Sequence, residues 1–431
     1  MRIEAWLTAD RAIAWLRVLA AMTALMVAAW VGLSHAGIDP TGKPLGTDFL
    51  SFWTAARLAA HSSPASAYDN AVIGGAQLAA FRGADTGYAP FSYPPTFLLL
   101  IAPLGMLPYF PALIAWLGLT GAAFVRVVRS WVREAYPSWL AVLAFPAVFL
   151  NLAHGQSAFL TAAIFGAGAL LLPRRPLLAG LCLGLLSVKP HLGLLIPFAL
   201  MASGEWLAIA GAAASSIGLA CESLLVFGPR PWSAFLHSTQ FMKEVVEQGM
   251  LDPAKLQSVF GALRAWHAPL WAAYGAQAAV AMCAGVAVVA VARRRPQSHA
   301  VGAVLIAATV LATPYLLDYD LTLIAIPLAW MLSEAVRTRF LPGERLVIFM
   351  AYVLPLASRV MAMKLHAPVA VPILVALLFV TVRRALLPRE VIAAASAWRL
   401  DFHIGMQLPN LVGRGARGGA NASKETQEAA G

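Results

Sequence analysis

Long apolar runs separated by mostly short polar segments repeat along almost the whole chain. A helix that crosses a bilayer needs about 20 apolar residues, and most runs approach that length. The pattern therefore predicts an all-α polytopic membrane protein. The runs cover roughly residues 13–33, 93–107, 109–128, 137–153, 157–173, 177–188, 191–203, 207–227, 268–292, 299–313, 321–336, 344–360 and 368–383.

Two groups of runs are short and interrupted by prolines, at 93–111 and at 177–203. Broken helices at membrane depth are tolerated where protein or a cavity satisfies the freed backbone groups, so they point to a site. Thirteen full crossings from an inside N-terminus would put the polar stretch 228–267 in the cytoplasm. We therefore expect one early run to cross incompletely, foremost within 93–128 and next within 177–203. The prediction is therefore about 12 spans, with both termini inside.

Composition supports a membrane protein and excludes several other classes. Hydrophobic residues make up 60% of the 431 residues and charged residues only 12%, and the mean hydropathy is +0.74. Soluble proteins carry about 25% charged residues. A chain this poor in charge is not an ordinary cytosolic enzyme, a disordered regulator or a disulfide-rich secreted domain.

The formal net charge of +11 is better explained by topology than by a nucleic-acid partner. The arginines gather in short clusters between apolar runs, as the positive-inside rule predicts for cytoplasmic loops. These clusters are Arg11 and Arg17; Arg126, Arg129 and Arg133; Arg174 and Arg175; Arg293, Arg294 and Arg295; Arg337, Arg339 and Arg345; Arg383, Arg384 and Arg389.

The remaining segments set the predicted organisation. Run 13–33 follows Arg2 and Arg11, contains Arg17 near its start, and is typical of a signal anchor. The long polar stretches 34–92 and 228–267 balance acids against bases without an arginine cluster, so both are predicted as outer loops. We expect residues 1–403 to form one multispan unit, and the glycine-rich, basic segment 404–431 to be a disordered cytoplasmic tail.

The first predicted outer loop contains the sequence GTDFLSFWTAARLA, in which Asp48 precedes an apolar stripe at near-helical spacing. This predicts a short helix lying along the membrane surface, with Arg57 on its polar side. Asp48 has two readings. It is an ordinary N-cap of that helix, or it is a general base at the membrane boundary, where an aqueous acceptor meets a lipid-borne donor.

Several short motifs occur in order after Asp48: S-P-x-x-x-Y-D (63–69), Y-P-P (93–95), N-L-x-x-G-Q (151–156) and L-A-G-L-x-x-G-L-x-x-x-K-P (178–190). Each is weak alone, but their order and spacing between apolar runs make the set specific. The chain resembles glycosyltransferase family 87, the polyprenol-phosphate-mannose-dependent mannosyltransferase group of the GT-C superfamily, over about residues 40–340.

The resemblance implies a GT-C helical bundle with interfacial helices in its first outer loop. It also implies a lipid-linked sugar donor, transfer on the outer face and an acidic catalytic base in that loop, a role that only Asp48 matches by position. Related mannosyltransferases use a histidine in a later outer loop, whereas the corresponding stretch here, Thr313 to Asp320, contains none.

Other residues suit the chemistry of a sugar phosphate. A leaving phosphate needs cationic partners. Lys189, one of six lysines, lies between two short apolar runs, where lysine is costly and usually functional unless it snorkels to the interface. The expected donor-phosphate residues are Lys189, His191 and Arg57, with Arg230 as a further alternative. The expected substrate-binding residues are Tyr93, His154, Gln156, Asp318 and Asp320.

Each of these residues also has a structural reading. Tyr93 suits the aromatic belt, His154 and Gln156 suit a tight turn, and His191 suits an interfacial position. The motif Asp318-Tyr319-Asp320 resembles the metal-binding D-x-D of nucleotide-sugar enzymes, but a lipid monophosphate donor lacks the diphosphate that this motif serves. We expect no metal site and no cofactor.

The sequence thus predicts a hexosyltransferase, foremost a mannosyltransferase, of the bacterial inner (plasma) membrane. Asp48 would be its general base, and its site would face the periplasm or exterior. The expected partners are a polyprenyl-phosphate-linked sugar donor, a glycolipid or glycan acceptor and the lipid bilayer, with no nucleic acid. The alternatives are a secondary transporter or lipid flippase, which shares the multispan architecture, and a non-catalytic scaffold.

Overall fold

The computed structural model describes residues 9–61, 63–81, 87–132 and 138–388. These residues form α-helices and short 3-10 helices and contain no β-strand, which confirms the predicted all-helical class. Several residues used in the sequence argument lie outside the described ranges: Arg2, Arg82, Asp85, Arg133, Arg389 and the predicted tail 404–431.

Six helices in the described part are long and apolar enough to cross a membrane. Their polar backbone groups are satisfied within each helix, which is the condition for crossing lipid. The chain is therefore a helical membrane protein. The six are α2 (Ala9–Gly32), α6 (Tyr109–Trp131), α12 (Trp206–Phe227), α15 (Leu270–Arg294), the pair η6 (Asp318–Ile324) and α17 (Ala325–Thr338), and α18 (Glu344–Leu365).

The other apolar runs form shorter pieces, so the total of about 12 spans remains a prediction. The run at 93–107 becomes α5 and the 3-10 helix η2, and both pack against α3. These pieces are α5 (Pro95–Ile101), η2 (Ala102–Met106), α7 (Ser138–Leu143), α8 (Pro146–His154), α9 (Ala158–Leu171), α10 (Pro176–Gly184), η3 (Leu185–Val188), η4 (Pro190–Gly193), α11 (Ile196–Ser203), α16 (His299–Ala312) and α19 (Ala370–Leu386).

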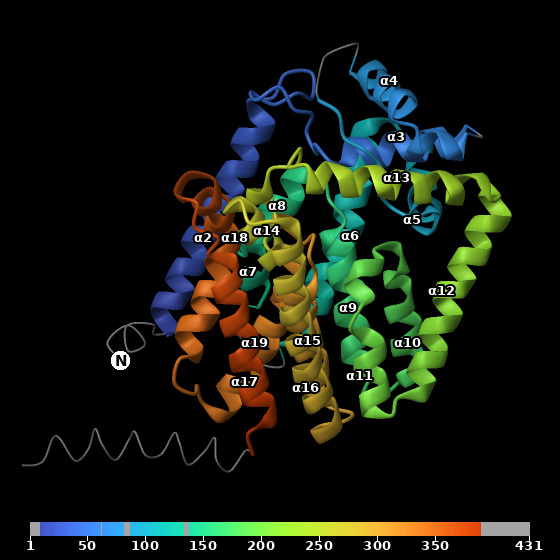
Figure 1. The fold of residues 1–431 in the computed structure, drawn as a ribbon. Coiled ribbons are helices and arrows are strands. Elements are labelled where there is room, and N and C mark those ends of the chain that lie inside the picture. Colours follow the sequence, from blue (N-terminus) through green and yellow to red (C-terminus); the bar gives the residue numbers. More distant parts are fainter. Residues whose placement is uncertain (1–8, 62, 82–86, 133–137, 389–431) are drawn as a thin grey trace, which may run out of the picture.

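The two polar stretches fold as crosswise helices at one end of the bundle (Figure 1). At the opposite end lie the last turns of α15, α17 and α19, which carry Arg293, Arg294, Arg337, Arg383 and Arg384. Of the elements in these two stretches, α3 (Phe49–Ala60) and α13 (Arg230–Glu247) lie across the bundle. The others are η1 (Pro64–Tyr68), α4 (Asn70–Ala80), η5 (Pro253–Lys255) and α14 (Val259–Ala265). The arginine clusters at the ends of α15, α17 and α19 thus lie at the end of the bundle opposite α3 and α13.

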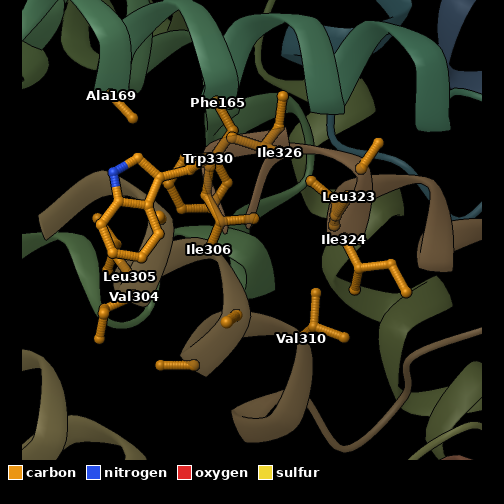
Figure 2. Packing of buried hydrophobic residues seen from close by; sticks show 14 of the residues in the cluster. Phe165, Ala169, Val304, Leu305, Ile306, Val310, Leu323, Ile324, Ile326 and Trp330 are labelled. Atoms are coloured by element: carbon orange, nitrogen blue, oxygen red, sulfur yellow. The ribbon is translucent and has the colours of Figure 1, made fainter. Parts of the chain in front are cut away.

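The core of the bundle centres on α16, which is buried from Ala300 to Ala312. A helix that is apolar all round is expected to be enclosed by other elements. Figure 2 shows Phe165 and Ala169 of α9 and Trp330 of α17 packed around Val304 and Ile306 of this helix. This packing fixes α9 and η6, two elements that reach the site described below.

Close helix packing also positions the segment before Lys189. Gly180 of α10 faces α12 so closely that a Cβ atom on it would lie 2.1 Å from the carbonyl oxygen of Ala208. Small residues at such crossings let two backbones approach in a membrane, where packing replaces the hydrophobic drive. The α10–α12 pair therefore forms a rigid base for η3 and the lysine that follows it.

The arginine end has a structural ion pair of its own. Arg384 of α19 is buried and donates to both carboxylate oxygens of Glu344, at 2.9 and 2.5 Å. It also donates to Thr338 Oγ1 and to the Arg339 carbonyl. Arg384, one of the clustered arginines, therefore connects α19 with α18 and with the end of α17.

Candidate active site

Asp48 lies immediately before α3, in the position of an N-cap, but its side chain makes no cap hydrogen bond. Its φ and ψ of −82° and −21° are already helical, whereas a capping residue usually adopts extended values that aim its side chain back at the helix. The carboxylate is instead turned toward Gln156, whose Nε2 donates to Oδ2 at 2.9 Å. The simple N-cap reading is therefore wrong in this structure.

The junction of α8 and α9 holds the Asp48 loop. The Asp48 backbone N–H donates to the carbonyl oxygen of His154, the last residue of α8, at 2.9 Å. The next residue, Gly155, has a φ of +64°, and a Cβ atom there would lie 2.6 Å from Cβ of Phe49. Only glycine adopts this turn without strain and leaves room for α3. The N-L-x-x-G-Q motif is thus the turn that the sequence predicted, and it brings Gln156 to Asp48.

Hydrogen bonds fix the orientation of the Gln156 amide. Tyr93 Oη donates to Gln156 Oε1 at 3.0 Å, and the Ser157 N–H donates to the same oxygen at 3.1 Å. With Oε1 occupied by two donors, the Nε2 group is left to donate to Asp48. Burial raises the pKa of the Tyr93 phenol, which keeps its hydroxyl protonated as a donor. Oδ1 of Asp48 accepts no hydrogen bond from the described residues.

A second predicted motif supports Tyr93 from behind. Tyr68, in S-P-x-x-x-Y-D, donates its hydroxyl to the Tyr93 carbonyl at 3.0 Å. Asp69 of the same motif caps α4 by accepting from the backbone N–H groups of Ala71 and Val72. The aromatic rings of Tyr93 and Phe97 stack at 4.4 Å. The motif residues around Tyr93 therefore fix its position.

Lys189 lies between η3 and η4 and is buried, with its Nζ 2.5 Å from Oδ1 of Asp320. Asp320 has no exposed surface, so the pair is almost dry. The Lys189 ammonium also lies near enough to the Asp48 carboxylate for the two charges to interact. The structure thus brings together Asp48, Tyr93, Gln156, Lys189 and Asp320, which were predicted from five separate stretches of sequence.

The D-Y-D segment begins η6, and its two carboxylates bind two cations from different elements. Asp320 pairs with Lys189, while Oδ2 of Asp318 accepts from Arg359 of α18 at 3.3 Å. Tyr319 lies between them, with Lys189 Nζ 5.2 Å from its ring centroid. Asp318 and Asp320 are therefore each paired with a cation in this structure, and their predicted contact with substrate stays a prediction.

Two histidines lie at the edge of this arrangement. His154 is half-buried, donates from Nδ1 to the Leu150 carbonyl and has its ring 6.1 Å from that of Tyr319. His191 lies on η4, two residues after Lys189 in the chain. Neither side chain contacts Asp48, but both border the cluster.

Arg57 lies apart from Asp48. It is nine residues further along α3, which at 1.5 Å per residue is about 13 Å away, and its guanidinium stacks over Trp53 at 5.3 Å. The predicted helix forms as α3, and other elements bury every residue from Phe49 to Ala56, whereas Arg57 is exposed. The location of α3 at the membrane surface stays a prediction. The elements η1, η2, α4, α5 and α6 pack around it.

Arg359 is the functional candidate that sequence reasoning missed. An arginine within an apolar membrane helix is costly, so one near the end of run 344–360 was itself a signal. Within the described part of the chain, no group of three or more His, Cys, Asp or Glu side chains could hold a metal ion. The acidic residues of the site are instead arranged around Lys189, Arg359 and Gln156.

Comparison with known proteins places the chain in a protein family. A sequence model described as glycosyltransferase family 87 matches residues 91–314, which is more than half of the chain and includes Tyr93, Gln156 and Lys189. Asp48, Asp318 and Arg359 lie outside the matched segment. No curated protein matches the chain, and no solved structure does.

Proposed function

The chain belongs to glycosyltransferase family 87, and from that premise we propose that it transfers a hexose, foremost mannose, from a polyprenyl-phosphate donor to a hydroxyl acceptor. The proposed acceptor is a glycolipid or glycan on the outer face of the bacterial inner membrane. The observation that carries the proposal is the Asp48 carboxylate. It is held by Gln156, leaves Oδ1 open and lies near a buried lysine.

In the proposed reaction, Asp48 Oδ1 takes the proton of the acceptor hydroxyl as that oxygen bonds to the anomeric carbon. The bond from the anomeric carbon to the phosphate oxygen breaks, and its electron pair remains on the phosphate. General-base help of this kind contributes about 10²–10⁴-fold. A single direct displacement inverts the anomeric configuration, by the logic of inverting glycosidases.

The charge balance of this step gives Lys189 its proposed role. Before transfer, one negative charge is on Asp48 and one on the phosphodiester; afterwards, Asp48 is neutral and the lipid phosphate is a dianion. Negative charge therefore moves from the carboxylate toward the phosphate. A buried ammonium favours this shift, because its field is weakly screened. Asp320 keeps Lys189 charged and aligned before the donor arrives.

A lipid donor is supported by the location of the cluster in a membrane-helix bundle and by the family. Sugar nucleotides are made inside the cell, whereas a polyprenyl-phosphate sugar can be presented on the outer face. The D-Y-D carboxylates, each paired with a cation, are not arranged to hold a divalent metal on a sugar diphosphate. The same observation supports a monophosphate donor.

The test compares two donors on the purified protein in lipid vesicles containing a membrane acceptor extract. We expect label to pass from polyprenyl-phosphate [¹⁴C]mannose to acceptor, and not from GDP-[¹⁴C]mannose. Transfer from the nucleotide sugar would contradict the proposed donor class. Movement of the labelled lipid across the bilayer without sugar transfer would favour the transporter or flippase alternative.

A further inference from the structure

Helix α13 lies across one end of the bundle (Figure 1) and packs on η1, α5 and α12. Its 18 residues extend over about 27 Å at 1.5 Å per residue. Pro231 is the only buried residue of this helix, so burial of an apolar face does not explain its position. Contacts in its first half and at its last residue hold it, and they lead to different parts of the candidate site.

The first half of α13 is joined to the Asp48 side of the site. The ring of Phe235 packs edge-on against the ring of Tyr68, with the two centroids 5.9 Å apart. Tyr68 donates its hydroxyl to the Tyr93 carbonyl. Tyr93 in turn donates to Gln156, which holds the Asp48 carboxylate. Phe235 therefore supports the first of a series of contacts that ends at the proposed base.

The last residue of α13, Glu247, accepts the end of a chain of hydrogen bonds from the other side of the site. Its Oε1 accepts from the Tyr274 hydroxyl at 2.8 Å, and the hydroxyls of Tyr274 and Tyr315 lie 2.6 Å apart. A hydroxyl has one proton to donate. Since Tyr274 donates its proton to the carboxylate, Tyr315 must donate to Tyr274. The chain therefore runs from Tyr315 through Tyr274 to Glu247.

A glutamate at the last position of a helix needs an explanation, because the C-terminal end carries the negative pole of the helix dipole. Lys243 lies one turn earlier, with its Nζ 3.7 Å from Glu247 Oε1, but the lysine side chain is 64% exposed. Ion pairs of this kind contribute little. The Tyr274 hydroxyl is closer to the carboxylate, so the tyrosine contact accounts for Glu247 at this position.

Tyr315 belongs to the segment 313–317, which residues 256–258 hold from the second polar stretch. The contacts are the Gln257 N–H to the Leu316 carbonyl at 2.7 Å, the Ser258 hydroxyl to the Pro314 carbonyl, and the backbone bridge between Leu256 and Leu317. The D-Y-D segment follows without a break. A shift of 313–317 would therefore move the two carboxylates that pair with Lys189 and Arg359.

We propose that α13 is a brace between the two halves of the site, the Asp48 carboxylate on one side and the Lys189 ammonium on the other, and that Glu247 is a positioning residue of this brace. The inference rests on the proposed function and adds to it the contacts that keep base and cation at a fixed separation. Glu247 acts through Tyr274 and Tyr315. During transfer, negative charge moves from the carboxylate toward the phosphate, so the benefit of the ammonium depends on that separation.

Turnover of variants in the hydrogen-bond chain tests the Glu247 end, with the full chain in lipid vesicles and polyprenyl-phosphate [¹⁴C]mannose. Tyr274→Phe removes the middle hydroxyl, and we expect kcat to fall about tenfold with KM nearly unchanged. Glu247→Leu should show the same loss, whereas Glu247→Gln retains an acceptor oxygen and should recover most of the turnover. Tyr88→Phe removes a hydroxyl bound to Asn70 at 2.6 Å, outside this chain, and should match the wild type.

Two results would overturn the role of Glu247. One is a kcat of Tyr274→Phe equal to that of the wild type. The other is a loss in Glu247→Gln as large as the loss in Glu247→Leu, since the amide oxygen still accepts from Tyr274.

Phe235→Ala tests the opposite end of the brace and should also lower kcat about tenfold. Phe241→Ala is the control, because Phe241 lies on the same helix and is 38% exposed; it should transfer at the wild-type rate. If both ends are needed for one brace, Phe235→Ala combined with Tyr274→Phe should cost little more than either change alone. Losses that multiply would show two independent contacts and would contradict the brace.

Hydrogen–deuterium exchange gives a readout that needs no transfer. In the full chain in detergent micelles, Tyr274→Phe should speed amide exchange across 313–320, while Tyr88→Phe leaves it unchanged. Faster exchange in Tyr274→Phe without any transfer by the wild type would refute the proposed function and leave the positioning of the D-Y-D segment standing. Transfer by the wild type, together with unchanged exchange and unchanged kcat in Tyr274→Phe, would refute the brace alone.

Discussion

At the residue scale, the site depends on hydrogen bonds that leave few alternative orientations. Tyr93 and the Ser157 N–H occupy Gln156 Oε1, so the amide donates to Asp48. The carboxylate is thereby held with one oxygen open to an acceptor hydroxyl. Gln156 is a positioning residue in this account, since it acts on the reaction through Asp48.

Replacing Gln156 should affect turnover more than substrate binding. Gln156→Leu removes a hydrogen bond to a charged group, worth about 1.5–3 kcal/mol, so we expect kcat to fall roughly 10–100-fold with little change in KM. Gln156→Glu places a second carboxylate beside Asp48, and two such groups do not ionise independently. The acid limb of the pH–rate profile should then move to higher pH. An unmoved limb would contradict the assigned role.

The Lys189–Asp320 pair should show separate structural and chemical effects. Lys189→Met leaves a buried carboxylate without its partner, which typically costs about 3–5 kcal/mol, so the thermal unfolding midpoint should fall. Lys189→Met combined with Asp320→Leu removes both charges, and we expect much of the midpoint to recover. Transfer activity should stay low in both. Recovery of activity in the double variant would show that the pair is structural only.

The sequence nominated Lys189 because a lysine between apolar runs is costly. It nominated Asp48, Tyr93, Gln156 and Asp320 by their places in the outer loop and in short motifs. The pairing could not be predicted. Lys189 and Asp320 are separated by 131 residues, and their contact depends on how α9, α10 and α16 pack. Arg359 lies singly within the apolar run 344–360, outside the arginine clusters between runs, so the charge pattern did not single it out.

At the scale of elements, the junction of α8 and α9 decides the geometry of the site. Its turn holds the Asp48 backbone through His154 and the Asp48 side chain through Gln156. The stripe preceding Arg57 predicted a helix, and α3 forms there, covered on all sides over its first two turns. The spacing of apolar residues shows that a helix forms. Which elements bury that helix, here η1, η2, α4, α5 and α6, depends on tertiary packing.

Gly155→Ala tests the junction. The added methyl group meets Phe49 Cβ at 2.6 Å, in a left-handed backbone conformation that is strained for alanine. We expect a lower thermal midpoint and at least a tenfold loss of transfer. Gly118→Ala on α6, where a Cβ would meet nothing within 4 Å, is the matched control. Equal midpoints and activities in the two variants would contradict the role of the turn.

At the scale of the whole molecule, the chain separates its chemistry along the bundle axis. Crosswise helices and the acidic site residues lie at one end, and arginine-bearing helix ends lie at the other (Figure 1). The hydropathy pattern predicted the helical class, and the positions of the arginine clusters predicted that they share one end of the bundle, because both follow from local composition. It could not settle the span count, since proline-interrupted runs fold into pieces such as α5 with η2 and α10 with η3.

The most direct test of the central claim is the transfer rate of Asp48→Asn with polyprenyl-phosphate mannose, measured beside Asp69→Asn. Asp69 belongs to the same polar stretch and caps α4, a role that asparagine also fills. We predict that Asp48→Asn loses about 10²–10⁴-fold in kcat while its thermal midpoint is retained, and that Asp69→Asn transfers at the wild-type rate. Full activity of a folded Asp48→Asn protein would contradict the account.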